Sequence, residues 1–253
     1  MTVEITRFYD SISDRYHLLH DDRSAWLEMT GTALDGLIGE LIGPARQRVL
    51  DCSCGIGTQA LALAARGHAV TGTDLSEAAL QRTAREAEVA GLRLRTAVAD
   101  MRRLREAVQG PFDVVLSCDN SIAHLERSEL PVAFAEMHAL LQSAGVVLVS
   151  VRDYEPLVAQ RPRFMSPAAA PDGGSIAFQL WEWAGDGSSY ALQQFFLEEV
   201  DGRWETTCER TRLHAHARST VLGALTDAGL EDVRWHPPAE TGYYQPIATG
   251  RRA

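Results

Sequence analysis

The chain has 253 residues, of which 45% are hydrophobic, and its formal net charge at pH 7 is -10. The length suits one α/β domain with a modest insertion, while the acidic charge argues against nucleic acid as a partner, because that backbone requires clustered positive charge. The sequence contains no lysine, which excludes Schiff-base chemistry and a Walker phosphate loop. No apolar run approaches the roughly 18 residues of a membrane span, and the N-terminus lacks the apolar core of a signal peptide, so we expect a cytoplasmic protein without a membrane partner.

The first predicted element is an amphipathic helical segment within residues 1–30. Tyr9 and Tyr16 lie seven residues apart and could share a helical face, as could His17 and His20 at i, i+3. Two interpretations stay open. The segment either caps the sheet with its histidines exposed, or forms a lid that closes over cofactor and substrate and brings a tyrosine or histidine to the acceptor.

Between residues 45 and 155, short apolar runs alternate with helical patterns. The predicted strands are Gln47–Cys52, Ala69–Thr73, Leu92–Val98, Phe112–Ser117 and Val146–Val151. The predicted helices are Thr58–Arg66, which Gly67 ends, 77–90, for which Ser76 is the N-cap, and Val132–Leu141, with Pro131 tolerated in its first turn. Strands that alternate with helices of this length indicate a doubly wound parallel sheet.

The pattern changes after strand five. Residues 161–175 are rich in proline, glycine and alanine and predict a loop. The runs 176–183, 190–200 and 203–216, separated by GDGSS and DG, predict antiparallel strands. A helix at Thr220–Ala228 and strands near Glu231–His236 and Gln245–Gly250 then return to the main sheet.

A glycine turn follows the first predicted strand. Asp51 ends that strand, and Gly55 and Gly57 precede a helix whose N-terminus attracts negative charge. Asp74 ends the second strand, where a carboxylate can accept both hydroxyls of a ribose. Asp100 ends the third strand and can accept from an adenine amino group. Together these acids outline an adenosine site at the carboxyl edge of the sheet.

The same turn lacks the third glycine of a dinucleotide fingerprint. Ala60 stands where G-x-G-x-x-G requires that glycine, and no segment is suited to a second nucleotide. A nicotinamide-dependent dehydrogenase is therefore the weaker alternative.

The segments DCSCGIGTQ, TGTDLS, CDNSIAHL and VSVRDYE resemble the class I S-adenosylmethionine-dependent methyltransferases over roughly residues 45–155, and among them the glycine and sarcosine N-methyltransferases. The resemblance implies S-adenosylmethionine as cofactor and S-adenosylhomocysteine as product. It implies cofactor contacts from Tyr9, Trp26, Ser53, Gly55, Gly57, Asp74, Leu75, Asp100, Met101, Cys118 and His124. It implies substrate contacts from Asn120, Arg152 and Tyr154, with Arg152 at a position where that family grips a substrate carboxylate.

The N-terminal segment departs from the glycine-type pattern. RYHLLHDDRSAW replaces an isoleucine-phenylalanine pair and an Asp-Trp, so His20 is an extra polar group at the pocket mouth. A lid with a Tyr/His pair resembles the indole C3-methyltransferases of bacterial alkaloid biosynthesis. Because attack by an aromatic carbon makes a cation that must lose a ring proton, we expect Tyr16 and His20 to form the base system.

Other candidate residues have simpler interpretations. Arg152 could instead pair with Asp153 or Glu155 on the surface. His214 and His216 alternate on a predicted strand, but no third ligand is near, so we expect no metal. Two further groups are expected to be buried packing residues: the four cysteines, and most of the aromatic set Trp181, Trp183, Phe195, Phe196 and Trp204.

The sequence therefore predicts one α/β domain over residues 1–253, a Rossmann-like, doubly wound, seven-stranded sheet. We expect an N-terminal helical lid (1–30), a cofactor-binding core (45–155), an antiparallel β insertion (161–217) and a return to the sheet (218–253). The predicted activity is methylation of a small-molecule acceptor, with an indole-type carbon first. A glycine-like amine is the alternative, followed by a cofactor-binding protein without turnover. A homo-oligomer is compatible with the sequence.

Overall fold

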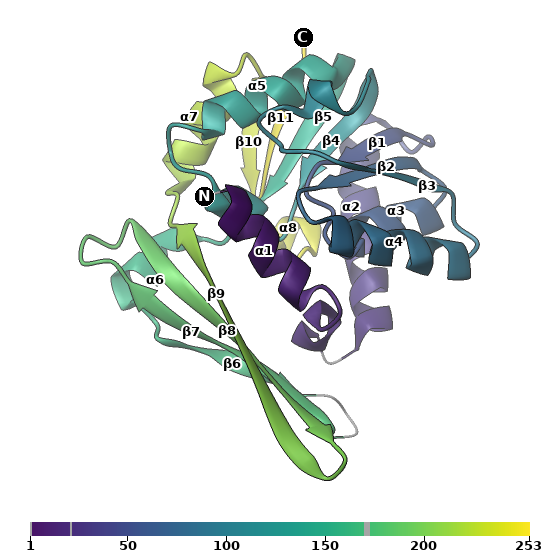
Figure 1. Cartoon of the computed structure of the whole chain (residues 1–253). Helices are drawn as coiled ribbons and strands as arrows, with labels where there is room; N and C mark the ends of the chain where they lie inside the picture. Colours follow the sequence, from purple (N-terminus) through teal and green to yellow (C-terminus); the bar gives the residue numbers. More distant parts are fainter. Residues whose placement is uncertain (1, 21, 170–172) are drawn as a thin grey trace.

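The computed structural model describes residues 2–20, 22–169 and 173–253. Its core is a seven-stranded sheet between two layers of helices (Figure 1). The strands, in spatial order, are β10 (Glu231–His236), β11 (Ile247–Arg251), β5 (Leu141–Ser150), β4 (Phe112–Ser117), β1 (Arg48–Asp51), β2 (Ala69–Asp74) and β3 (Leu94–Val98). β1 to β5 are mutually parallel, whereas β11 runs antiparallel to β5 and to β10. The predicted α/β fold is confirmed.

Helices cover both faces of this sheet. One layer contains α2 (Arg23–Ile42), α3 (Thr58–Ala65) and α4 (Glu77–Val89), and the other contains α5 (Leu130–Leu140) and α7 (Arg218–Asp227). The central strands are apolar because both of their faces are covered: Val114 and Val115 of β4 are fully buried. The predicted cap of α4 is present, since Ser76 Oγ accepts from the backbone N–H of Ala79 at 3.1 Å.

A second, antiparallel sheet projects from the core. It consists of β6 (Phe164–Ala169), β7 (Ser175–Trp183), β8 (Ser189–Val200) and β9 (Arg203–His214). The loop predicted for 161–175 is wrong over β6, which pairs with β7. The proline-rich composition is compatible with this strand because β6 is at the sheet edge and its register shifts between Met165 and Ala168. Residues 170–172 of that predicted loop lie outside the described residues.

The predicted aromatic set divides along this sheet. Trp181 and Phe196 are fully buried in the core, whereas the Trp204 side chain is exposed in β9. The rings of Phe178 and Phe195 stack on one another at 4.8 Å between centroids. Packing is therefore the role of these buried rings, and Trp204 has no part in it.

The N-terminal segment forms short helices that lie across the carboxyl ends of the parallel strands (Figure 1). α1 (Thr2–Ile12) is followed by the 3-10 turn η1 (Tyr16–Leu19). Tyr9 and Tyr16 therefore share no helix, although their ring centroids are 6.2 Å apart. Further short elements are η2 (Leu104–Glu106), η3 (Ser121–His124), α6 (Tyr154–Gln160) and α8 (Pro238–Thr241).

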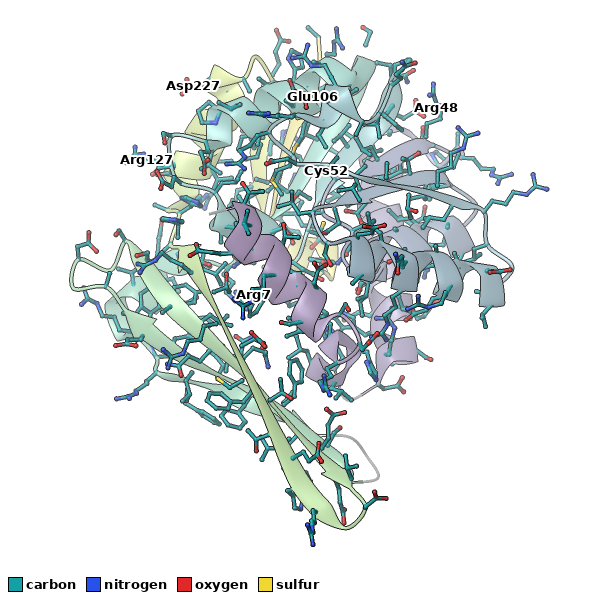
Figure 2. The ribbon with its side chains drawn as sticks, in the orientation of Figure 1. Arg7, Arg48, Cys52, Glu106, Arg127 and Asp227 are labelled. Carbon is teal, nitrogen blue, oxygen red and sulfur yellow. The ribbon has the colours of Figure 1, made fainter. Side chains whose placement is uncertain are left out.

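The outer surface carries the charged side chains. Figure 2 shows Arg48, Glu106 and Asp227 at the periphery, while Cys52 lies in the interior. Within the described part of the chain, no helix is both long enough and apolar enough to cross a membrane.

Candidate active site

The glycine turn after β1 is built around the carboxylate of Asp74. Asp74 Oδ2 accepts from the backbone N–H of Gly55 and Oδ1 from that of Ser76, both at 2.9 Å. Gly55 has φ +50°, and a Cβ placed there would meet no other atom within 4 Å. Burial raises the pKa of Asp74, and its backbone hydrogen bonds oppose that shift. The turn is thus held open by an acid at the end of the neighbouring strand.

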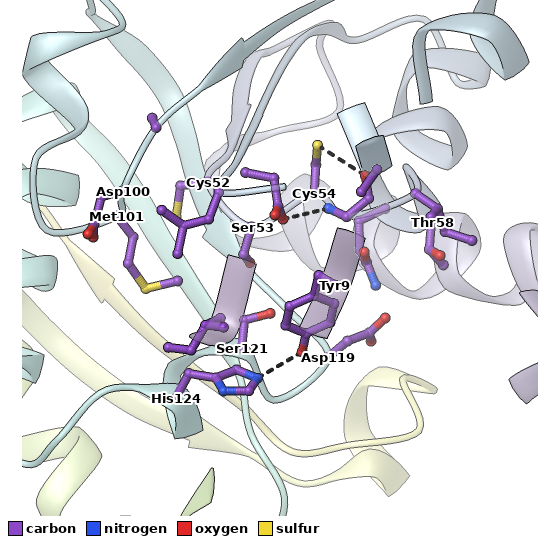
Figure 3. A pocket seen from close by; sticks show the side chains of 18 of the residues that line it. Tyr9, Cys52, Ser53, Cys54, Thr58, Asp100, Met101, Asp119, Ser121 and His124 are labelled. Carbon is purple, nitrogen blue, oxygen red and sulfur yellow. Dashed lines mark hydrogen bonds between the residues drawn. The ribbon is translucent and has the colours of Figure 1, made fainter. Parts of the chain in front are cut away.

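α1 closes over this turn through hydrogen bonds at several points. Asp10 accepts from Ser76 Oγ at 2.6 Å, and Arg82 of α4 donates to the carbonyl of Ser13 at 2.6 Å. The hydroxyl of Tyr9 lies 2.8 Å from Nε2 of His124 (Figure 3). Burial lowers the pKa of His124 to about 4 and raises that of Tyr9, so both groups are neutral at pH 7.

These elements enclose a cavity of about 910 Å³, its open mouth included. This volume is within the range of small-molecule sites. The cavity brings together nine residues that the sequence predicts for the site. They are Tyr9, Tyr16, Ser53, Gly55, Asp74, Leu75, Asp100, Met101 and His124.

Asp100, at the β3 end of the cavity, is already engaged. Arg102 donates to both of its carboxylate oxygens and also contacts Glu129 and the hydroxyl of Thr2 in α1. Burial raises the pKa of Asp100, but the hydrogen bonds from Arg102 outweigh it and the net shift is downward. The carboxylate predicted to meet adenine therefore also connects the start of α1 to the core.

Three predicted residues lie outside the cavity wall for identifiable reasons. Gly57 is the N-cap of α3 with φ +86°, where a Cβ would approach Thr83 and Leu61 to within 2.9 Å. Cys118 is buried beneath the cavity. Trp26 packs instead on Tyr244, with ring centroids 4.7 Å apart.

His20, predicted as part of the base system, is stacked on Trp26. The two ring centroids are 4.1 Å apart with planes at 19°. Tyr16 lines the cavity, whereas His20 is not among the described residues that do. Burial raises the pKa of Tyr16, and the Asp119 carboxylate adds to that shift, so its hydroxyl stays protonated.

The predicted substrate residues form one network next to the cavity wall. Asn120 donates to the Tyr154 hydroxyl at 2.8 Å, and that hydroxyl lies 3.1 Å from the Tyr190 hydroxyl. The guanidinium of Arg152 is 5.1 Å from the Trp181 ring and donates to Tyr190 at 3.3 Å. No described aspartate or glutamate forms an ion pair with Arg152.

Sequence reasoning missed Asp119 and the residues that hold it. Asp119 lines the cavity and accepts from the hydroxyls of Tyr243 and Tyr244. A signal for Asp119 was present, because a polar residue directly after a parallel strand faces the carboxyl edge of the sheet, as do Asp74 and Asp100. The two tyrosines come from the loop before β11 and carry no local motif.

The histidines and cysteines outside this cavity form no further centre. His214 and His216 stack with ring centroids 6.1 Å apart, and no described cluster of three metal-ligating residues exists. Cys52, Cys54 and Cys118 are buried thiols whose pKa values are raised by burial, while Cys208 is exposed.

The cavity fits an adenosine-containing cofactor that also carries an amino acid. Asp74 and Asp100 provide acceptors for hydroxyl and amino groups, and Leu75 and Met101 provide apolar walls. The open space at Gly55 leaves room for a ligand close to the backbone. The fold and this site define a nucleotide-dependent α/β enzyme class.

Comparison with known proteins identifies the family. Residues 49–145 match the family described as "Methyltransferase domain". A candidate methyltransferase of Geobacillus sp. (strain WCH70) is 35% identical over 188 residues, covering 73% of this chain and 74% of that protein. The chain belongs to the class I S-adenosylmethionine-dependent methyltransferases, whose cofactor is S-adenosylmethionine.

Other similar proteins differ in their acceptors. The glycine/sarcosine N-methyltransferase of Parasynechococcus marenigrum (strain WH8102) is 30% identical over 152 residues, covering 60% of this chain and 52% of that protein. The chain thus spans about half the length of this relative. The structure of the CcbJ methyltransferase from Streptomyces caelestis superimposes with a TM-score of 0.77 at 17% identity, covering 100% of this chain and 99% of that one. This structural likeness shows the fold alone.

Proposed function

We propose that the chain methylates a small acceptor, with an electron-rich aromatic ring of the indole type as first candidate. The observation that supports this is the aromatic wall of the cavity. The Tyr9 ring lies 6.2 Å from that of Tyr16 and 5.4 Å from that of His124, between centroids. A flat ring can pack on such a wall with offset or edge contacts.

The chain's own residues supply alignment and exclusion of water. S-adenosylmethionine, when bound, supplies a methyl carbon activated by positive sulfur. Asp74 and the glycine turn hold its ribose and backbone-facing part, and α1 covers the cavity, so acceptor and methyl group meet in a site with little water. Tyr9 and Tyr16, both protonated, orient the acceptor as hydrogen-bond donors. The base role predicted for Tyr16 and His20 remains part of this proposal.

An amine of the glycine type is the second candidate, and Arg152 favours it. A guanidinium beside Trp181 that has no described carboxylate partner could take its counter-ion from the acceptor. The identity with the glycine/sarcosine N-methyltransferase supports the same choice. An acceptor that carries a carboxylate would approach from the side of Arg152 and Tyr190.

The experiment that tests these proposals supplies cofactor with a ¹³C-labelled methyl group and acceptor mixtures of indole derivatives, glycine and sarcosine. We expect label on an aromatic carbon, read by NMR of the product. Label on nitrogen would favour the second candidate. Absence of transfer to every acceptor, from a protein that binds S-adenosylhomocysteine, would overturn both. Asp74→Asn is the control, because it should lose transfer to all acceptors together.

A further inference from the structure

The loop after β4 presents a carboxylate in an unusual backbone conformation. Asp119 and Asn120 have φ values of +58° and +66°, a left-handed conformation that costs energy in residues other than glycine. The backbone N–H of Asp119 donates to Ser150 Oγ at 2.8 Å, which fixes the loop against β5. Strain of this kind is retained where the surrounding structure holds it in place.

Two consecutive tyrosines orient that carboxylate. The hydroxyls of Tyr243 and Tyr244 both donate to Oδ1 of Asp119, at 2.6 Å and 2.8 Å. Tyr243 is fully buried and also accepts from Nε2 of Gln59, in the first turn of α3, at 3.0 Å. Oδ1 is therefore occupied, whereas no described residue donates a hydrogen bond to Oδ2.

The charges around the cavity separate into two ends. Among the described residues that line it, Asp74, Asp100 and Arg102 belong to the nucleotide end, and Asp119 lies with Ser121 and His124 on the β4 side. Tyr9 and Tyr16 face this carboxylate closely enough for it to raise their pKa values further, beyond the effect of burial. Asp119 is therefore an anion with one open acceptor position where the methyl acceptor would bind.

We propose that Oδ2 of Asp119 accepts the N–H of the methyl acceptor and takes its proton as the methyl group arrives. This inference rests on the proposed function and applies to an indole or an amine alike. An electron pair of the acceptor forms the new bond to the methyl carbon, and the electrons of the broken carbon–sulfur bond stay on sulfur. The positive charge then rests on the acceptor nitrogen, its N–H electrons return to nitrogen, and the proton passes to the carboxylate and on to water.

Tyr243 and Tyr244 are positioning residues in this arrangement. By holding Oδ1, they leave the other oxygen to point at the acceptor. In Asp119→Asn the amide oxygen would stay with the two tyrosine hydroxyls, so an NH₂ donor would face the acceptor N–H. The variant keeps the shape of the loop but reverses the hydrogen bond.

The test is calorimetric binding of indole and 1-methylindole to the protein loaded with S-adenosylhomocysteine. Wild type should bind indole at least about tenfold more tightly, because only indole donates to the carboxylate. Asp119→Asn should lose this preference. Tyr244→Phe should reduce it about threefold, and it keeps the inference testable if Asp119→Asn does not fold. Asp227→Asn, at the exposed end of α7 (Figure 2), is the matched control and should keep it.

A kinetic measurement completes the test. For an acceptor that takes label, Asp119→Asn should lower kcat by about 10²–10⁴-fold, the usual value of general base catalysis, with cofactor affinity unchanged within about threefold. Equal binding of the two indoles by wild type would overturn the inference. So would loss of about tenfold or more in S-adenosylhomocysteine affinity in Asp119→Asn, since the carboxylate would then belong to the cofactor. If the preference for indole holds but no acceptor is methylated, the proposed function fails and the N–H site stands.

Discussion

The hydroxyl of Tyr9 lies 2.8 Å from Nε2 of His124, so the first helix of the chain is hydrogen-bonded to the 3-10 turn after β4. One partner comes from the segment that covers the cavity and the other from its wall. Because both side chains are buried when α1 is closed, the bond exists only in that arrangement. It connects closure over the cofactor with the surface that meets the acceptor.

Tyr9→Phe should therefore weaken closure of α1. Loss of one hydrogen bond costs about 0.5–1.5 kcal/mol, which corresponds to an increase in the cofactor Kd of roughly two- to tenfold. Hydrogen exchange of the α1 amides should speed up by a similar factor. Thr6→Val is the control, because the Thr6 hydroxyl bonds only to the Thr2 carbonyl within the same helix. Unchanged exchange in Tyr9→Phe would contradict a closing role.

Asp74→Asn should weaken S-adenosylmethionine binding by about 1–3 kcal/mol. The carboxylate would lose its bonds to ribose hydroxyls, and its hold on Gly55 N–H would weaken at the same time. Isothermal calorimetry measures the affinity, with the thermal midpoint as a folding check. Asp113→Asn is a matched control, since Asp113 also accepts a backbone N–H, that of Arg48, at the opposite end of the sheet. Equal affinities in the two variants would remove Asp74 from the site.

Arg152 distinguishes the two acceptor classes. With an uncharged indole, Arg152→Ala should change kcat/KM by less than about tenfold, since only its contacts with Trp181 and Tyr190 are lost. With a carboxylate-bearing amine, KM should rise by about 100-fold or more, and Arg152→Lys should rescue only part, because lysine lacks the bidentate fork. Steady-state kinetics with indole derivatives and glycine provide the comparison.

Much of the cofactor half could be predicted from the sequence because its signals are local. The strand ending at Asp51, the turn with Gly55 and Gly57, and the cap at Ser76 lie within some thirty consecutive residues, and each has a recognisable pattern. Asp74 follows as the end of the next strand. The nucleotide end of the cavity is thus encoded by neighbours in the chain.

The acceptor half could not be predicted in the same way. Asp119 meets Tyr243 and Tyr244 only because β11 inserts beside β5, which brings together residues more than a hundred positions apart. Likewise β6 exists because β7 pairs with it, although its own composition predicts a loop. Contacts of this kind arise from packing and leave no periodicity in the sequence.

Stability should fall as the pH drops from about 6.5 to about 4. Burial lowers the pKa values of both His124 and His216 to about 4, while an unfolded chain keeps them near 6.5. In this window the unfolded state binds protons that the folded state excludes, so the free energy of unfolding falls by up to about 1.4 kcal/mol per pH unit for each histidine. Urea unfolding at pH 7, 6 and 5 measures the slope. His216→Gln should reduce it by one proton, and a flat profile would contradict both burial assignments.

Tyr16 and His20 should separate when each is substituted. Tyr16 lines the cavity, so Tyr16→Phe should lower kcat while cofactor affinity stays within about threefold. His20 reaches the site through a series of contacts: its ring stacks on Trp26, Trp26 packs on Tyr244, and Tyr244 donates to Asp119.

His20→Ala and His20→Phe together test whether His20 is the base. If it is, both variants should lose about 10²–10⁴-fold in kcat, along with the acidic limb of the pH–rate profile near 6.5. If its role is to support Trp26, His20→Ala should lose less than about tenfold and His20→Phe, which keeps a flat ring, should restore most of the rate. The 4.1 Å stack leads us to expect restoration by phenylalanine. A His20→Phe protein as slow as His20→Ala, with the acidic limb gone, would return the proton to His20.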